Sequence, residues 1–498
     1  MNRSRLAAAL LPPLAALALA LAPPGESAQA QAAAAPQSGD LLCLKDGRIL
    51  EGRPMERVAG GILVKFMNGD VRVPDALVLD ALLEDEAAAA EPKKAAELQK
   101  RRDERRRYVD ELKSLAEWRN RRKETTRHFE FEYTVPPHVF AGYRDSMEAY
   151  FTEFAKLWNT KQPKDGRLKV CFYGDAGTFH QVAGVGGGVL GYFRFVDPME
   201  LDIYFDRLDP ELTEDVMFHE ANHYLQKLLN PDVKMPHFPG EALAEYYGAS
   251  AWNPQTKRLT VGLIQDERLA EVKHDQDSGK KVPLEELLST ANMYEHYTWG
   301  WTLVHYLMNQ PRYAKKFQRF VVGLVNGADV ERQQTGLQGL SELKDGEVLR
   351  TFMKQLDLKG KEGLKKLEDE WYAYITTELK AVTARGFEKA GLKVARSYPP
   401  RPIKAKNLLR KSLDAGSKSA DVRDKLAGIL ASEDGAFPEA IALWREAIEI
   451  EPLTARYYSN LAHALEKSGK KEEGKRLLAL AKELDPDDPW LDLDLRGS

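Results

Sequence analysis

Residues 210–229, PELTEDVMFHEANHYLQKLL, predict one amphipathic helix on which the rest of the fold is organised. Asp209 and Pro210 form a helix-start signal, because aspartate caps helix N-termini and proline fits the first turn. Apolar residues then recur at helical spacing, at Leu212, Val216, Leu225, Leu228 and Leu229. His219 and His223 are four residues apart, so their side chains are expected on the same side of this helix.

The pentapeptide HEANH at residues 219–223 matches the His-Glu-x-x-His pattern of zinc sites. Two imidazoles at this spacing can reach one Zn²⁺, and the Glu220 carboxylate can reach a metal-bound water. A pattern this short also arises by chance, on the order of once per hundred chains of this length. A catalytic zinc keeps one coordination position for water, so a third protein ligand is expected from a second element.

That second element is predicted at residues 239–248, PGEALAEYYG. This stretch resembles the glutamate-bearing helix of the gluzincins, the thermolysin and aminopeptidase relatives. The resemblance implies that Glu241 is the third zinc ligand. Glu245, one turn later, matches the carboxylate that orients a zinc-binding histidine in thermolysin-type enzymes, with a solvated helix glutamate as the alternative. His237 is a rival third ligand.

A third motif lies at residues 297–307, YTWGWTLVHYL. It is similar to the Y-x-x-G-x-x-L-x-x-x-L helix of the aminopeptidase and leukotriene hydrolase branch. In that branch the tyrosine hydroxyl donates to the oxyanion of the tetrahedral intermediate, whose charge the metal alone only partly neutralises. The resemblance makes Tyr297 the candidate donor, with Tyr294 and His296 as alternates. A buried structural tyrosine is the competing interpretation.

The three motifs span residues 126–325 in the family's order and are most similar to Peptidase-MA-like proteins of bacteria, which often carry signal peptides and tetratricopeptide repeats. The resemblance implies one Zn²⁺ held by His219, His223 and Glu241. Glu220 would then act as the general base toward the attacking water and pass the proton to the leaving amine. The GAMEN-type motif that binds a free amino terminus is not evident upstream, so aminopeptidase activity is not implied.

The N-terminus predicts export. Arg3 and Arg5 precede an apolar run at residues 6–22, and the small-residue site Ala28-Gln29-Ala30 follows. This arrangement indicates a cleaved signal peptide over residues 1–30 and a periplasmic or extracellular protein, with a retained anchor as the alternative. No later stretch of the sequence is long and apolar enough to span a bilayer, so no membrane span is expected after cleavage.

Two segments precede the zinc-binding region. Residues 40–83 hold short apolar runs divided by turn signals at Asp46-Gly47 and Asn68-Gly69, which predict hairpins and a small β-barrel-like module. Residues 84–125 are rich in Glu, Lys, Arg and Ala. Mixed charge signs with few aromatic residues favour a charged helical spacer over a nucleic-acid-binding segment, so no nucleic-acid partner is expected.

The region around the first zinc motif has an α+β pattern. An amphipathic stretch at residues 139–158 predicts a helix, and strands are expected at 168–173 and 201–205. The glycine-rich run 184–191, GVGGGVLG, has no P-loop or dinucleotide fingerprint and predicts a mobile turn or substrate flap. We expect this run and the strand at 201–205 to line the cleft and pair with an extended peptide.

The C-terminal region repeats itself with a period of 34 residues. Residues 421–454 align with 455–488, superposing Gly435 on Gly469 and Pro452 on Pro486. The pattern resembles a pair of tetratricopeptide repeats, with another helix expected near residues 404–416. Such helical hairpins offer a surface on which a protein partner can dock.

Composition and cysteine content exclude some classes of protein. The net charge of -4 gives no reason to expect an anionic membrane or nucleic acid as partner. Two cysteines, Cys43 and Cys171, are too few for a disulfide scaffold or a multi-cysteine zinc domain. Cys171 lies in a strand-like run, where a small buried hydrophobe is favoured over a disulfide.

The sequence therefore predicts a multidomain α+β protein: the small β module, the spacer, a zincin-like domain over residues 126–400 and tetratricopeptide hairpins over 404–490. The expected function is that of an exported zinc peptidase acting on peptide or protein substrates. One alternative is a catalytically silent zinc-binding scaffold that acts through its repeats. Another is a zinc amidase or esterase acting on a cell-wall component.

Overall fold

The structure is a computed structural model. It describes residues 39–45, 48–88, 92–162, 166–186, 189–195, 199–206, 210–336, 339–380, 382–397, 400–486, 488 and 491. The predicted signal peptide over residues 1–30 lies outside the described residues, as do Asp46-Gly47, Gly187-Gly188 and Asp209. Within the described ranges, no helix combines the length and apolar character needed to cross a bilayer.

The N-terminal module consists of two separate antiparallel sheets. Its strands are β1 (Leu41–Leu44), β2 (Ile49–Glu51), β3 (Met55–Val58), β4 (Gly61–Phe66), β5 (Gly69–Pro74) and β6 (Val78–Leu82). One sheet has the order β2-β1-β6 and the other β3-β4-β5. The prediction of hairpins is confirmed, but that of a barrel is wrong, because each sheet keeps its own ladder and only side chains such as Leu42, Ile62 and Val64 pack between them.

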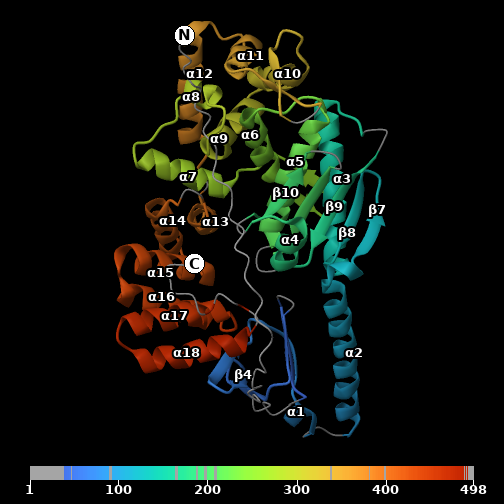
Figure 1. Cartoon of the computed structure of the whole chain (residues 1–498), viewed down its shortest axis with the longest axis vertical. Helices are drawn as coiled ribbons and strands as arrows, with labels where there is room; N and C mark the ends of the chain where they lie inside the picture. The colour runs from blue at the N-terminus through green and yellow to red at the C-terminus, as the bar shows by residue number, and fades with distance from the viewer. Residues whose placement is uncertain are drawn as a thin grey trace, which may run out of the picture.

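A long helix leads away from this module. The connecting elements are α1 (Glu84–Ala88), α2 (Pro92–Ala116) and the 3₁₀ turn η1 (Trp118–Asn120). At a rise of about 1.5 Å per residue, α2 extends about 37 Å, and Figure 1 shows it running alone from the module to the central sheet. The end of the predicted spacer, residues 122–125, forms a strand of that sheet.

The central sheet has five strands in the order β10-β11-β9-β8-β7. They are β7 (Arg122–Thr125), β8 (Phe129–Tyr133), β9 (Leu168–Tyr173), β10 (Gly191–Arg194) and β11 (Glu200–Tyr204). The three inner strands run parallel, whereas β7 and β10 pair antiparallel at the two edges. Strands were predicted at 168–173 and 201–205, and both are confirmed.

Helices cover both faces of this sheet. They are α3 (Pro137–Trp158), α4 (Ala176–Ala183) and α5 (Pro210–Lys227). Phe131, Val170 and Leu201 point to the face shared with α3 and α5, where the main hydrophobic core lies. Cys171 points to the opposite face, where it packs with Phe179 of α4. Cys43 and Cys171 are both buried and unbonded, as expected for small hydrophobes.

A helical layer follows α5 and shares its core. Its helices are α6 (His237–Gly248), α7 (Asp266–Asp277), α8 (Leu284–Ser289), α9 (Glu295–Asn309), α10 (Pro311–Asn326), α11 (Glu347–Gln355) and α12 (Gly360–Thr377). Two hairpins interrupt it, β12 (Ala251–Asn253) with β13 (Arg258–Thr260) and β14 (Arg332–Gln334) with β15 (Ser341–Leu343). Trp301, Leu303 and Leu307 of α9 are fully buried in this core.

The C-terminal region is entirely helical over its described residues. Its elements are α13 (Ala384–Ala395), α14 (Pro402–Asp414), α15 (Ala420–Ile429), the π-helical turn η2 (Leu430–Asp434), α16 (Phe437–Ile450), α17 (Ala455–Lys467) and α18 (Lys471–Leu484). The additional helix predicted near 404–416 is confirmed as α14. The two sequence repeats coincide with the helix pairs α15–α16 and α17–α18, so the region is a helical repeat.

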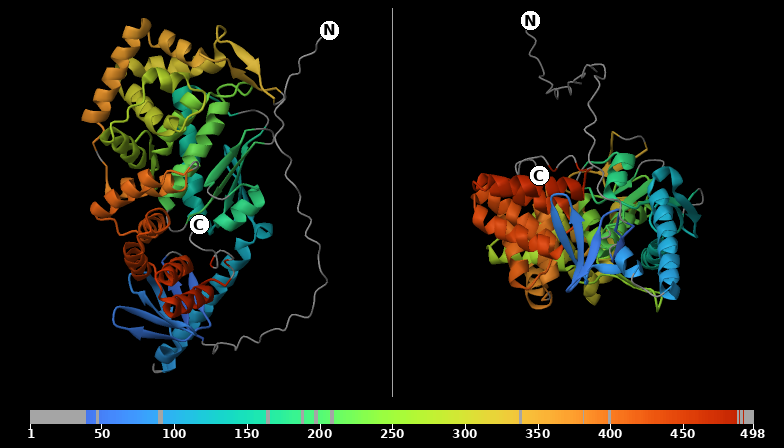
Figure 2. Two further views of the ribbon diagram at one scale, coloured as in Figure 1. Left: turned by 60° about the vertical axis from the view of Figure 1, so that its left-hand side comes forward. Right: turned by 90° about the horizontal axis from the view of Figure 1, so that it is seen from below.

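The last helices return to the N-terminal module. Val71 of β5 packs in one cluster with Tyr458 of α17 and Leu480 of α18, and Figures 1 and 2 show the two regions side by side. The Glu483 carboxylate of α18 accepts hydrogen bonds from the backbone N–H groups of Met67 and Asn68, in the β4–β5 turn, at 2.8 Å each. The last two repeat helices therefore pack against the N-terminal module, although the sheet and the helical layer lie between them in the sequence.

Candidate metal centre

Helices α5 and α6 bring three predicted ligands together. The Glu241 Oε2 atom lies 3.3 Å from His219 Nε2 and 3.4 Å from His223 Nε2. A ligand atom from each residue lies within 4.8 Å of the other two. The two histidines are neighbours because they lie one turn apart on α5, whereas Glu241 reaches them because α6 packs across that helix.

These distances fit a tetrahedral metal. Metal–ligand distances of about 2.0–2.1 Å separate neighbouring ligand atoms of a tetrahedral zinc site by about 3.3–3.4 Å. Glu241 Oε2 is also a buried oxygen without a hydrogen-bond partner in the structure. An acceptor of this kind is costly to bury unless a cation faces it. The donor set and its spacing therefore fit a zinc ion.

The charges of this cluster are compatible with a bound metal ion. Burial lowers the pKa of His223, but the Glu241 carboxylate outweighs that effect and raises it to about 9. Burial raises the pKa of Glu241, while His223 and His219 outweigh it and hold this pKa well below its usual range. The carboxylate is thus held ionised against positive charge, which either protonated imidazole or a metal ion with neutral imidazoles can supply.

Glu245 lies behind the first histidine. Its Oε1 atom is 3.5 Å from His219 Nδ1, on the side of the ring away from Glu241. Only 2% of the Glu245 side chain is exposed, so the alternative of a solvated helix glutamate is wrong. Arg268 of α7 binds both carboxylate oxygens. Burial raises the pKa of Glu245, but Arg268 and Lys393 outweigh it and lower the pKa to about 2.

Glu220 faces the sheet edge. Its Oε2 atom accepts a hydrogen bond of 3.1 Å from the backbone N–H of Phe193 in β10. The strand reaches this close because Gly191 has no side chain: a Cβ there would lie 2.6 Å from Val216 Cγ1 and 3.1 Å from Glu220 Cγ. Glu220 therefore lies between its own helix and the edge strand.

One expectation about this edge is wrong. The strand at 201–205 was expected to pair with an extended peptide, but β11 (Glu200–Tyr204) is bonded to β10 on one side and to β9 on the other. The edge position belongs to β10, which follows the glycine-rich run. Gly184 ends α4 in a left-handed conformation and Gly191 begins β10, while the middle of the run, Gly187-Gly188, lies outside the described residues.

Tyr297 lies beside the cluster. Its ring stacks on that of His219 with centroids 6.1 Å apart and an interplanar angle of 14°. Burial and then the Glu241 and Glu245 carboxylates raise the pKa of the Tyr297 phenol, and a hydrogen bond to Glu241 acts in the same direction. The hydroxyl is therefore held protonated, as a hydrogen-bond donor must be. The guanidinium carbon of Arg268 lies over the Tyr297 ring, 5.5 Å from its centroid.

The alternates have other partners. His296 Nε2 lies 2.9 Å from the Leu287 carbonyl oxygen, and its Nδ1 lies 2.6 Å from Nδ1 of His237. His237 is thus paired with a histidine and is not among the clustered ligand atoms. The Tyr294 hydroxyl donates to Glu271 at 2.9 Å. The arrangement favours Glu241 over His237 and Tyr297 over Tyr294 and His296.

Sequence reasoning missed Arg268. This arginine is 1% exposed and touches Glu245, Glu271 and Tyr294. The signal in the sequence is the high density of charged residues in α7, DERLAEVKHDQD, where a packed helix usually carries a wider apolar stripe. In the structure Glu267, Arg268, Glu271 and Asp275 are buried. Charged residues on a packed helix must pair with opposite charges, which indicates an ion-pair network.

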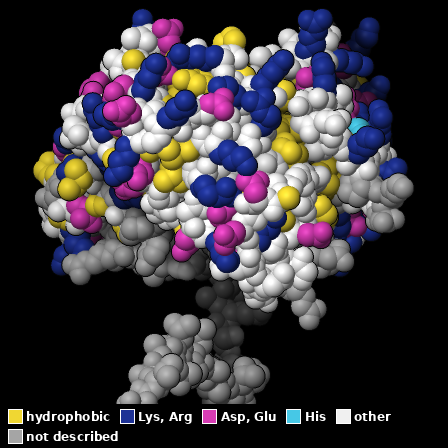
Figure 3. All heavy atoms as spheres, turned by 90° about the horizontal axis from the view of Figure 1, so that it is seen from above, with side chains coloured by type: hydrophobic (Ala, Val, Ile, Leu, Met, Phe, Trp, Pro, Cys, Tyr) yellow, Lys and Arg dark blue, Asp and Glu magenta, His cyan; other side chains and the backbone are white. Residues whose placement is uncertain are grey.

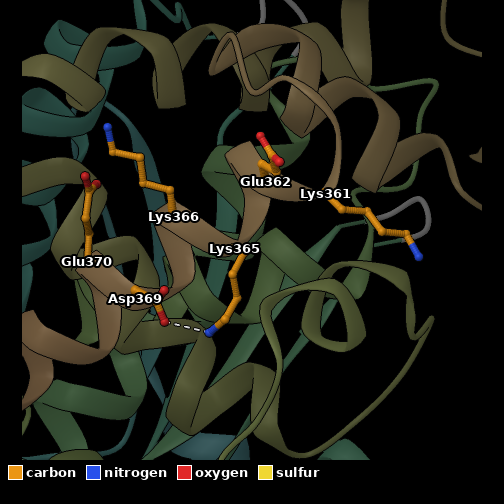
Figure 4. Close-up of a pocket in the computed structure, with 6 residues that line it drawn as sticks. All are labelled: Lys361, Glu362, Lys365, Lys366, Asp369 and Glu370. Carbon is orange, nitrogen blue, oxygen red and sulfur yellow. Dashed lines mark hydrogen bonds and ion pairs between the residues drawn. The ribbon is translucent and has the colours of Figure 1, made fainter.

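One surface hollow lies along α12. Figure 4 shows the six residues that line it, among which Lys365 pairs with Asp369 at 2.6 Å. All six come from one exposed helix face and carry both charge signs, as expected for a solvated surface. On the face drawn in Figure 3, Lys and Arg side chains are likewise interspersed with Asp and Glu.

Comparison with known proteins assigns no family. No family model matches the sequence, and no curated protein is significantly similar to it. Among solved structures, a crystal structure of MamA matches at 20% identity over 28% of this chain and 78% of that chain, with a TM-score of 0.20. Another MamA structure, titled AMB-1 P212121, matches at 21% identity with the same coverage and the same TM-score.

Proposed function

We propose that this chain is a zinc-dependent hydrolase that cleaves amide bonds in peptides. The observation that carries the proposal is the position of Glu241 Oε2, at 3.3 and 3.4 Å from the Nε2 atoms of His219 and His223. Three donors of this kind leave a fourth tetrahedral position for a reactant, which distinguishes catalytic from structural zinc. When bound, the zinc supplies Lewis acidity that polarises a carbonyl and lowers the pKa of water.

The surrounding side chains take the remaining roles. Glu220 accepts a proton from the attacking water and passes it to the leaving amine, while the Phe193 N–H fixes one of its oxygens. Tyr297 donates to the oxygen on which negative charge develops. The Glu245 carboxylate, 3.5 Å from Nδ1 of His219, favours the tautomer with the proton on Nδ1, so that Nε2 keeps its lone pair for the metal.

The resemblance to gluzincins supports this assignment, because three motifs occur in that family's order and their key residues gather at one place. The signal-like N-terminus supports export to the periplasm or beyond, where the substrate would be a peptide or protein. The helical repeat would serve as a docking surface for a protein partner. Within this proposal residues 126–400 form the peptidase domain and 404–490 the tetratricopeptide region.

A second candidate is a binding protein whose zinc centre is catalytically silent and whose repeats dock a partner. The repeat helices α15 to α18, which α13 and α14 precede in the described part of the chain, favour it. The same centre could also hydrolyse an amide or ester in a cell-wall component, because the zinc chemistry is shared.

The test combines metal analysis with hydrolysis. Purified protein should hold one zinc per chain and cleave members of a broad peptide library. Glu220→Gln should lower kcat by at least about 100-fold with zinc retained, since a general base contributes about 10²–10⁴-fold. Glu362→Gln, on the exposed face of α12 (Figure 4), is the matched control. Full zinc occupancy without turnover would favour the binding protein, and turnover unaffected by Glu220→Gln would refute the mechanism.

A further inference from the structure

Helix α7 buries an unusual amount of charge next to the metal centre. Together with Glu245 of α6, its Glu267, Glu271 and Asp275 place four carboxylates at 5% exposure or less. Arg268 lies among them, bound to Glu245 and to Glu271. One guanidinium neutralises only one of four negative charges, and buried carboxylates without cations are strongly destabilising.

The C-terminal helices supply further cations. Lys393 of α13 pairs with Glu267 at 2.8 Å and lies 3.9 Å from Glu245. Lys404 of α14 lies 3.0 Å from Asp275 and 3.2 Å from Glu271. These two lysines reach the acidic cluster from α13 and α14, which follow the helical layer of the metal centre in the chain.

Apolar packing fixes these helices in place. Ala270 of α7 lies in one cluster with Ala390 and Val394 of α13 and with side chains of α14. The helices approach closely at Gly386, where a Cβ would lie 2.7 Å from the Cβ of Asp266. The lysine positions are therefore set by a packed interface.

We propose that α13 and α14 complete the metal centre, and that Lys393 is a positioning residue for zinc binding. The path runs from Lys393 to Glu267 and Glu245, and from Glu245 to Nδ1 of His219. This inference rests on the proposed function. It adds that the C-terminal region sets the affinity of the metal site in addition to any docking role.

The consequence of removing Lys393 follows from the same contacts. Glu267 would lose its 2.8 Å partner and would compete for Arg268, which already lies 3.8 Å from it. Arg268 would then interact with both Glu267 and Glu245. The Glu245 carboxylate, which orients His219, would be held less firmly. Changes to residues that orient metal ligands cost about 10–100-fold in metal affinity.

The experiment measures the zinc affinity of full-length protein by competition with a chromophoric chelator, and the visible spectrum of the Co²⁺ form. Lys393→Met should weaken zinc binding about 10-fold and alter the Co²⁺ bands, whereas Lys393→Arg should restore both. The double change Glu267→Gln/Lys393→Met removes the stranded carboxylate as well, and should recover most of the affinity. Lys411→Ala is the control, because Lys411 pairs with the exposed Asp277 across the same interface at 2.8 Å.

The outcomes separate the two proposals. Wild-type protein without zinc affinity, or with affinity unchanged by His223→Ala, would overturn the proposed function. If wild-type protein binds zinc and Lys393→Met has the same zinc affinity and Co²⁺ spectrum, only the role of Lys393 is overturned. This holds even if the Tm of Lys393→Met is lowered. If Lys393→Met does not fold, the double variant tests the proposal. A double variant with a normal melting curve but a zinc affinity at least 10-fold below that of wild type would contradict the charge argument.

Discussion

The contact between Glu483 and the β4–β5 turn predicts that the N-terminal module depends on the far end of the chain. The two oxygens of this carboxylate each accept a backbone hydrogen bond of 2.8 Å, from Met67 and Asn68, and Arg53 lies 3.6 Å away. The module itself has fewer than fifty residues and a small core. Domains of that size are marginal alone, so docking should contribute much of the module's stability.

Glu483→Ala removes these two backbone hydrogen bonds and a third from the Asn68 side chain. The two backbone bonds set the lower limit of the effect. Hydrogen bonds to charged groups contribute about 1.5–3 kcal/mol each. Partial exposure of the turn reduces this to roughly 1–1.5 kcal/mol, so the two bonds give about 2–3 kcal/mol. Because about 1.4 kcal/mol corresponds to a factor of ten, opening of the module should become about 30–150 times more frequent.

Hydrogen exchange in the β4–β5 ladder reports this opening. Val64 and Val71 face each other in that ladder, and their amides should exchange faster in Glu483→Ala by the stated factor. Amides of the β8–β9 ladder serve as the internal reference. Glu472→Ala, on the same helix but with an 88% exposed side chain, should change neither. Unchanged exchange at Val64 and Val71 in Glu483→Ala, or an equal acceleration in Glu472→Ala, would refute the reasoning.

Three further outcomes are expected. Gly191→Ala should lower peptide hydrolysis at least about tenfold with zinc retained, because the added methyl would meet Val216 and push β10 off α5. Burial raises the pKa of Asp202 to about 6 despite the Tyr173 hydroxyl, so ionisation destabilises the folded state as pH rises from about 4 to 6. Asp202→Asn should therefore gain up to about 3 kcal/mol over wild type in urea unfolding between about pH 4 and pH 7.5. Trp444→Ala should cost about 3–5 kcal/mol in unfolding of the helical repeat, followed by circular dichroism.

Local pattern was sufficient for the elements of the site and for much of the fold. The start signal at Pro210 and the apolar spacing placed α5, and the four-residue step placed His219 and His223 on one side of it. Short strand-like runs likewise placed β9 and β11. These features depend on residues close in sequence, where steric and periodic rules act directly.

Pairing between distant segments was not predictable in the same way. The barrel was expected because six short strands with turn signals are compatible with either one closed ladder or two open sheets. The strand at 201–205 was expected to pair with a peptide, but β10 holds the edge of the sheet. Both segments have strand-like composition, and the order of strands in a sheet depends on packing between distant residues. Gly191 illustrates such packing, since its missing side chain lets β10 lie against α5.

The buried charges were likewise not predictable from the sequence, because each depends on residues far away in the chain. Glu245 was equally compatible with a solvated position, because one sequence cannot show that Arg268, 23 residues later, folds against it. Lys393 lies still further along the chain and yet reaches the same carboxylate. Each of these groups is costly to bury alone and tolerable only in the presence of the others. The network therefore requires α6, α7 and α13 to assemble together, so the carboxylate beside His219 depends on a helix that begins more than 130 residues after α6 ends.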